Sequence, residues 1–156
     1  MVDPVVVVGG GTAGCTVVAH LAAATDADIV LIEPGGRSPS DDVPGFFDVL
    51  AGADSWPVED YGQPRVLGGG SAVNGLVLSG DPPPHVEGLT RMATPADMGP
   101  AAQALLAAGG RPLRLWWNGG RWNPGRAVAH LVDEGRIEHR RAAAERIEVR
   151  LSLIHI

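Results

Sequence analysis

Residues 5–14 read Val-Val-Val-Val-Gly-Gly-Gly-Thr-Ala-Gly and carry the strongest indication of the fold. Four consecutive β-branched residues are typical of a strand that is buried on both faces of a parallel sheet. The Ala-, Val- and Leu-rich residues 13–24 predict a helix, and residues 28–33 predict a second strand. The sequence therefore predicts a Rossmann-like α/β domain, of the kind that binds FAD or NAD(P), with a parallel sheet seeded by residues 4–9 and 28–33.

The glycines at positions 9, 11 and 14 have the spacing of a dinucleotide-binding turn. Gly9 permits a tight turn, Gly11 lets the backbone approach a pyrophosphate, and Gly14 lets the helix pack close to the strand. The helix start at Thr12 and Ala13 offers free N–H groups and the positive end of the helix dipole. A dinucleotide site is the favoured interpretation, and a purely structural strand–helix turn is the alternative.

Glu33 ends the second predicted strand, about 20 residues past the last glycine of the turn, where a carboxylate accepts hydrogen bonds from ribose hydroxyls. An acid at this position disfavours a 2′-phosphate. FAD or NAD therefore fits the site better than NADP.

Composition narrows the class of protein. The 156 residues suffice for one domain with its own core, and the 45% hydrophobic content is that of a globular protein. A net charge of −6 argues against nucleic acid as a partner. No apolar run approaches the ~20 residues of a membrane span. All basic residues are Arg, which excludes mechanisms that need a P-loop lysine or a Schiff base.

The single cysteine, Cys15, excludes an internal disulfide and fits a reducing compartment. Residues 1–4 lead directly into a strand without a basic segment, so the sequence predicts no signal peptide and a cytoplasmic location. Cys15 stands at a helix start, where a thiol pKa can fall, but a buried packing role is the favoured interpretation.

A second glycine segment spans residues 65–76, Arg-Val-Leu-Gly-Gly-Gly-Ser-Ala-Val-Asn-Gly-Leu. Such a backbone has free N–H groups and little side-chain bulk, so it can cradle an anion or lie against a flat ring. Asn74 adds an amide that both donates and accepts, which suits the edge of a flavin. By composition alone, a flexible loop is the alternative.

Together these segments resemble the glucose–methanol–choline (GMC) oxidoreductases, FAD enzymes that oxidise alcohols. Residues 9–15 are similar to the N-terminal signature of that family, residues 33–36 to its acid-plus-glycine segment, and residues 65–75 to its second signature. The resemblance implies that residues 68–71 meet the pyrophosphate and flavin, and that residues 74–76 lie near the isoalloxazine. The FAD-binding residues that it implies are Gly9, Gly11, Thr12, Ala13, Gly14, Glu33, Arg65, Leu67, Gly68, Gly69, Gly70, Ser71, Asn74, Gly75, Leu76 and Ala144.

A third match lies near the end of the chain. Residues 125–131 are similar to a family helix that precedes a strand, and residues 137–149 to a strand–turn–strand unit. The residue at the Ala144 position holds adenine through its backbone in that family, where Val is usual. Departures include Pro64 in place of Gly, and shorter segments between residues 33 and 65 and between residues 80 and 126.

The family's catalytic base lies several hundred residues downstream of these motifs. The resemblance thus implies a partial FAD-binding domain over residues 1–150 with no catalytic residue, and weak or no turnover by this chain alone. Residues 151–156, Leu-Ser-Leu-Ile-His-Ile, are predicted to be a non-native tail.

No metal site is predicted. His130 with Asp133 and Glu134 has helical spacing, but the interpretation is a solvated helix face. The predicted function is the FAD-binding part of an oxidoreductase that acts on CH–OH groups of a small-molecule alcohol by hydride transfer to flavin. The alternatives are a non-catalytic nucleotide- or flavin-binding module and an NAD-binding Rossmann enzyme.

Overall fold

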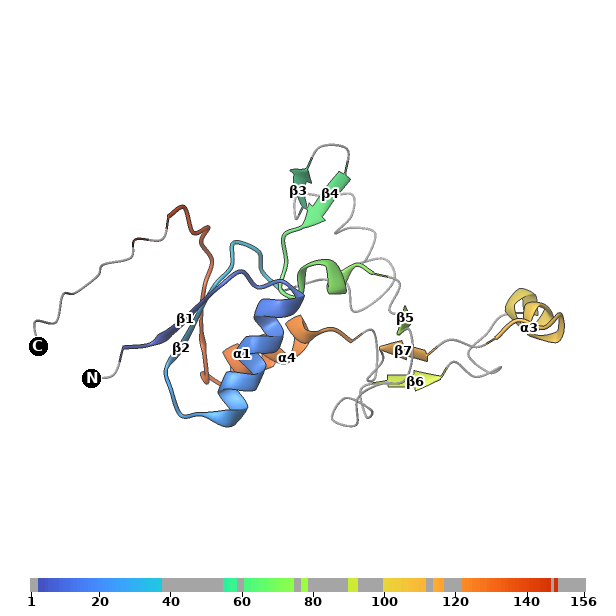
Figure 1. The fold of residues 1–156 in the computed structure, drawn as a ribbon, viewed down its shortest axis with the longest axis horizontal. Coiled ribbons are helices and arrows are strands. Elements are labelled where there is room, and N and C mark those ends of the chain that lie inside the picture. Colours follow the sequence, from blue (N-terminus) through green and yellow to red (C-terminus); the bar gives the residue numbers. More distant parts are fainter. Residues whose placement is uncertain are drawn as a thin grey trace, which may run out of the picture.

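The protein is described by a computed structural model (Figure 1). The residues that it describes are 3–37, 55–58, 61–74, 77–78, 90–92, 100–111, 114–116, 122–146 and 148.

A three-stranded parallel sheet organises the first and last thirds of the chain (Figure 1). Strand β1 (Val5–Val8) pairs with β2 (Ile29–Ile32), and β2 pairs with β8 (Glu138–Arg140), so the order is β1-β2-β8. Strands distant in sequence thus lie side by side and point the same way. This parallel sheet with its helices confirms the predicted Rossmann-like α/β fold.

Two helices pack against each other and share one core with the sheet. They are α1 (Thr12–Ala24), close to the predicted 13–24, and α4 (Pro124–Asp133), where the family helix was expected. The buried residues of this core come from both helices, from β2, from the segment that precedes the glycines at 68–70, and from the residue just before β8. They are Cys15, Val18, Ile29, Leu31, Leu67, Val128, Ala129 and Ile137.

One face of β1 departs from the expectation of a fully buried strand. Val7 packs against the core, but Val6 and Val8 are each 52% exposed. The prediction that β1 is buried on both faces is therefore wrong for the face opposite the core. The physical reason is that α1 packs on only one side of the strand, and no described element covers the other.

A third helix, α3 (Pro100–Ala107), lies in the middle of the chain. The sequence did not predict two small antiparallel sheets in the middle of the chain. Their strands are β3 (Ser55–Val58) with β4 (Tyr61–Pro64), and β5 (Val77–Leu78), β7 (Arg114–Trp116) and β6 (Thr90–Met92) in the order β5-β7-β6.

The last predicted unit is confirmed only in part. Strand β8 forms within residues 137–149, but residues 141–146 continue without regular structure. Residues 147 and 149–156 lie outside the described part of the chain, and the predicted tail at 151–156 is among them. None of the described helices is long and apolar enough to span a membrane.

Arg136 connects the segment before β8 to the end of α1. Its guanidinium donates to the carbonyl oxygens of Ala27 at 3.1 Å, of Ala22 at 3.3 Å, and of Thr25. The last carbonyls of a helix carry partial negative charge, so a cation there is favourable. This contact fixes where the chain enters the third strand of the sheet.

Candidate nucleotide-binding site

The turn between β1 and α1 needs glycine at two positions for two different reasons. Gly9 has φ +93°, and its N–H donates to the carbonyl of Ile32 at 2.9 Å. A Cβ on Gly14 would lie 1.8 Å from the carbonyl oxygen of Gly9. The first position thus requires a left-handed backbone, and the second requires the close approach of helix to turn.

The amino end of α1 is open. Gly11 is the N-cap residue, and no side chain accepts a hydrogen bond from the helix there. Thr12 and Ala13 are exposed, and the first turn carries no acidic residue. The leading N–H groups and the positive end of the dipole are therefore available to an anion.

The Glu33 carboxylate is held in a fixed orientation at the end of β2. The residue is 8% exposed, and its two carboxylate oxygens accept from the N–H groups of Gly10 and Gly35, each at 2.8 Å. Each carboxylate oxygen has a further lone pair to offer a hydroxyl. The two N–H donors fix the orientation of the Glu33 carboxylate. The contact of Glu33 with a ribose stays a prediction.

Residues 65–67 pack against the loop that follows Glu33 and hydrogen-bond to its backbone. The N–H of Leu67 donates to the carbonyl of Gly36 at 2.8 Å, and Gly36 forms a parallel bridge with Val66. A Cβ on Gly35 would lie 2.1 Å from the carbonyl oxygen of Arg65. The two predicted segments are thus in backbone contact here.

The second glycine segment also lies directly against the first. The N–H of Gly68 donates to the carbonyl of Gly10 at 2.8 Å, and a Cβ on Gly69 would lie 2.9 Å from Cα of Gly11. Gly68 has φ +93° and Gly69 has φ +51°. We call residues 9–14 and 68–71 together the glycine cradle.

Two hydroxyls hold the rim of the cradle. The carbonyl of Gly68 accepts from Thr12 Oγ1 at 3.1 Å and from Ser71 Oγ at 2.7 Å. Ser71 belongs to a short 3-10 helix, η1 (Gly69–Ala72), which follows the turn at Gly68. Both hydroxyls belong to predicted site residues, and both hold the Gly68 backbone in place.

Sequence reasoning missed the support behind the cradle. Asn123 is 3% exposed and caps α4, because its Oδ1 accepts from the N–H of Gly125 at 2.9 Å. A Cβ on Gly125 would lie 2.3 Å from the carbonyl of Leu67. The Asn123-Pro124 pair was the available signal, because Asn is a strong N-cap and Pro suits the first helical position.

Cys15 is fully buried and inert in this fold. Its thiol donates to the carbonyl of Gly10 at 3.0 Å. Burial raises its pKa from 9.0 to about 11, the Glu33 carboxylate also raises it, and a hydrogen bond from the Gly68 backbone lowers it. The packing interpretation is therefore confirmed, because the helix start does not produce a thiolate.

The other predicted site residues lie farther along the chain. Asn74 is exposed just after η1, and Ala144 is exposed in the irregular segment after β8. Gly75 and Leu76 lie outside the described residues. The structure thus unites the predicted pyrophosphate residues, and the flavin and adenine contacts stay predictions.

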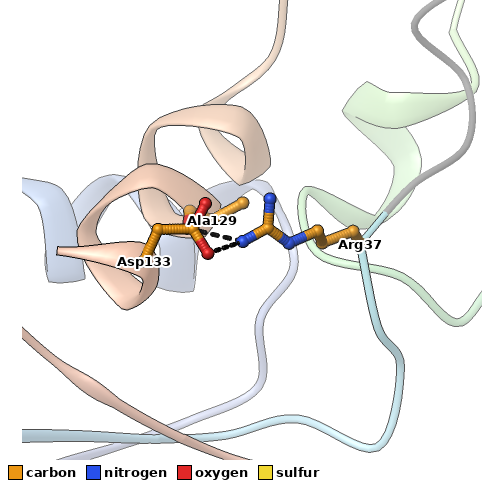
Figure 2. A network of polar contacts seen from close by, with 3 residues as sticks. All are labelled: Arg37, Ala129 and Asp133. Carbon is orange, nitrogen blue, oxygen red and sulfur yellow. Dashed lines mark hydrogen bonds and ion pairs between the residues drawn. The ribbon is translucent and has the colours of Figure 1, made fainter. Parts of the chain in front are cut away.

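A hollow of about 250 Å³ lies beside α4, lined in part by Arg37, Arg126 and His130. Figure 2 shows that the Arg37 guanidinium reaches α4, where it donates to the carbonyl of Ala129 at 3.2 Å and pairs with Asp133. His130 is itself 3.2 Å from Glu134. These paired, exposed side chains form a solvated helix face, and no metal-binding cluster occurs among the described residues.

Comparison with known proteins finds solved structures with a similar fold. No family model matches the chain. Among solved structures, it is similar to pyridoxine 4-oxidase from Mesorbium loti, with a TM-score of 0.62 and 17% sequence identity over 88% of this chain. The chain shares the fold of this oxidase. It covers 42% of that protein, so it spans less than half of its length.

Formate oxidase from Aspergillus oryzae RIB40 also matches, over a smaller region. One such structure covers 46% of this chain and 16% of the oxidase, at 28% identity and a TM-score of 0.36. The shared fold with pyridoxine 4-oxidase agrees with the α/β fold that the GMC resemblance implies for the N-terminal portion.

Proposed function

We propose that this chain binds FAD and is the N-terminal portion of a GMC-type oxidoreductase that oxidises CH–OH groups of a small-molecule alcohol. In this proposal residues 1–150 form the FAD-binding domain. The observation that carries it is the contact between the two glycine segments. The N–H of Gly68 bonds the carbonyl of Gly10, so both motifs line one surface at the amino end of α1.

Three glycines of the cradle face open space, which supports a pyrophosphate site there. A Cβ built on Gly9, Gly11 or Gly70 would meet no atom of the described residues within 4 Å, so the space over these three glycines is open in that part of the chain. Gly10, Gly14 and Gly69 are by contrast packed against other atoms of the protein. The glycines therefore divide into those that build the cradle and those that leave its surface bare for phosphate oxygens.

Glu33 favours a cofactor with a free ribose 2′-hydroxyl. Its carboxylate accepts two backbone N–H groups and is buried, so it stands ready as an oriented acceptor beside the turn. A 2′-phosphate would place negative charge against it without a compensating proton. This supports FAD or NAD over NADP, and the second glycine segment supports FAD over NAD.

FAD supplies the hydride acceptor when it is bound. The residues of this chain bind and orient it. The α1 start would stabilise the pyrophosphate charge, Glu33 would hold the ribose, and residues 68–71 would contribute backbone to the phosphate site. Water is excluded from the back of the cradle by Cys15 and Leu67, which are buried there.

The test is reconstitution of the 156-residue chain with FAD, followed by gel filtration and a visible absorbance spectrum of the protein peak. We expect a stoichiometric flavin spectrum. Gly11→Ala should reduce FAD affinity at least about tenfold, because its methyl fills the open cradle, an effect of about 1.4 kcal/mol. It should leave stability unchanged, because Gly11 has φ −69°, which alanine adopts without strain.

Gly62→Ala is the matched control, since it also adds one methyl but on β4, where the Cβ would lie 3.4 Å from the Ser55 side chain. It should keep wild-type FAD affinity. NAD binding without FAD binding would favour the NAD-binding Rossmann enzyme. Binding of neither ligand would contradict the proposal.

A further inference from the structure

Arg141 lies flat over the backbone of Gly36. A Cβ on Gly36 would be 3.5 Å from Cζ of Arg141 and 3.6 and 3.7 Å from its two terminal nitrogens. Because Cζ is the nearest atom and the nitrogens are almost equidistant, the face of the guanidinium and not its edge meets Gly36. A methyl at this position would lie at ordinary van der Waals distance from that face.

The opposite face of this guanidinium is open. Arg141 is exposed, and among the described residues the structure records no hydrogen bond or ion pair for it. Its neighbour Arg140 differs, because it pairs with Glu138 at 2.7 Å. Arg141 therefore presents a flat cation whose one side is backed by protein and whose other side faces solvent.

This plane stands beside the ribose end of the candidate site. The N–H of Glu33 donates to the carbonyl of Arg140 at 3.0 Å, so Arg141 follows the residue that pairs with Glu33. Both lie at the carboxyl ends of adjacent parallel strands, β2 and β8. Ligands of open α/β sheets bind outside these ends.

The backing of the plane is rigid. The carbonyl of Gly36 accepts from the N–H of Leu67 at 2.8 Å, and Gly36 bridges Val66. A guanidinium that is held on one face loses less conformational freedom when a ring covers the other.

We propose that Arg141, backed by Gly36, stacks on the adenine ring of the cofactor and so selects a purine nucleotide. This inference rests on the proposed function, since it needs an ADP moiety in the cradle. A planar, delocalised guanidinium stacks on aromatic faces, and purines use such planes in other protein–nucleotide contacts. The aliphatic cation of lysine would keep the charge but lose the plane.

The experiment is calorimetric titration of ADP and UDP into the full chain and three variants. Arg141→Ala and Arg141→Lys should each weaken ADP binding about three- to tenfold and reduce the preference for ADP over UDP. Arg140→Ala is the matched control. It removes the same charge from the neighbouring position, but the Arg140 side chain pairs with Glu138. It should keep wild-type ADP affinity.

The outcomes separate this inference from the proposed function. If the wild-type chain does not bind ADP, both are overturned. If it binds ADP and both Arg141 variants bind equally well, stacking alone is overturned. Wild-type affinity in Arg141→Lys with a loss in Arg141→Ala would show that charge and not the plane acts, which also overturns it. Tighter binding of 2′,5′-ADP than of ADP would identify a phosphate contact instead and overturn stacking.

Discussion

Helices α1 and α4 pack side by side but begin in opposite ways. At α1 the N-cap is Gly11, no side chain caps the helix, and open space lies over the turn. At α4 the N-cap is Asn123, which is 3% exposed. Its Oδ1 caps the helix by accepting a hydrogen bond from the N–H of Gly125. We infer that the capped start of α4 is structural and that the uncapped start of α1 is left accessible to a ligand.

The two helix starts are joined by one short segment. Gly68 donates to the carbonyl of Gly10 in front of α1, and Leu67 packs against Gly125 at the start of α4. The capped end therefore supports the open end from behind. Changes at α4 should alter stability first, and changes on the open surface of α1 should alter ligand binding first.

The largest expected effect is that of Gly14→Ala at the open helix. The added Cβ would lie 1.8 Å from the Gly9 carbonyl oxygen, so α1 must move away from the turn. We expect the free energy of unfolding to fall by about 3 kcal/mol, the upper part of the range for overpacking. Urea denaturation followed by circular dichroism measures it.

Gly11→Ala is the control for that change, because it adds the same methyl three residues earlier, into open space. Equal stability losses in the two variants would show that the turn responds to any methyl, and would contradict the division into packed and open glycines.

Asn123→Ala should remove the N-cap of α4. It removes the acceptor of the Gly125 N–H in a buried site, so we expect a loss of about 2 kcal/mol in the free energy of unfolding. Asn123→Ser keeps a capping oxygen and should recover much of this loss. The same urea titration measures both, and an unchanged midpoint in Asn123→Ala would argue that α4 needs no cap.

Cys15 gives the α1 end a pH dependence. Its pKa is raised from 9.0 to about 11 in the fold, so above pH 9 the unfolded chain loses a proton that the native chain keeps. Stability is therefore complete below pH 9 and falls as pH rises toward 11, by up to about 1.4 kcal/mol per pH unit.

Cys15→Ala should remove this component of the pH dependence. The measurement is the urea midpoint across that pH range for both proteins. A wild-type curve parallel to that of the variant would contradict the raised pKa.

The smallest expected effect is that of Arg37→Ala at the far end of α4. The Arg37 guanidinium pairs with Asp133, and this hydrogen bond holds the pKa of Asp133 below its usual range (Figure 2). Both side chains are more than half exposed, so water and salt screen the pair. We expect a barely measurable shift of the thermal midpoint, which added salt abolishes. A salt-independent shift as large as that of Asn123→Ala would contradict this.

Local patterns were enough to predict the parallel unit. The valine run, the glycine spacing and the apolar run before Glu33 specify β1, α1 and β2 because each element carries its own periodicity and turn. The glycines at 68 and 69 were expected near the same ligand on the strength of a resemblance. Their backbone contact with Gly10 and Gly11 depends on tertiary packing, which no local pattern contains.

What the sequence did not predict depends on partners distant in the chain. The exposure of Val6 and Val8 follows from which elements cover β1, and the strand pattern carries no such information. The Gly10 and Gly35 donors of Glu33 and the Arg141–Gly36 contact arise only when the carboxyl ends of β2 and β8 come together. The short strands of the β5-β7-β6 sheet are too brief to show a period.

Amide chemical shifts of the full chain during titration with ADP show whether the open start of α1 is the nucleotide site. We expect the largest changes at Thr12, Ala13 and Gly14 and in the Glu33–Gly36 loop. Gly125 and Arg126, at the capped start of α4, should change little. Changes centred on the α4 start, or none at the α1 start at saturating ADP, would contradict the conclusion that the open helix is the nucleotide site.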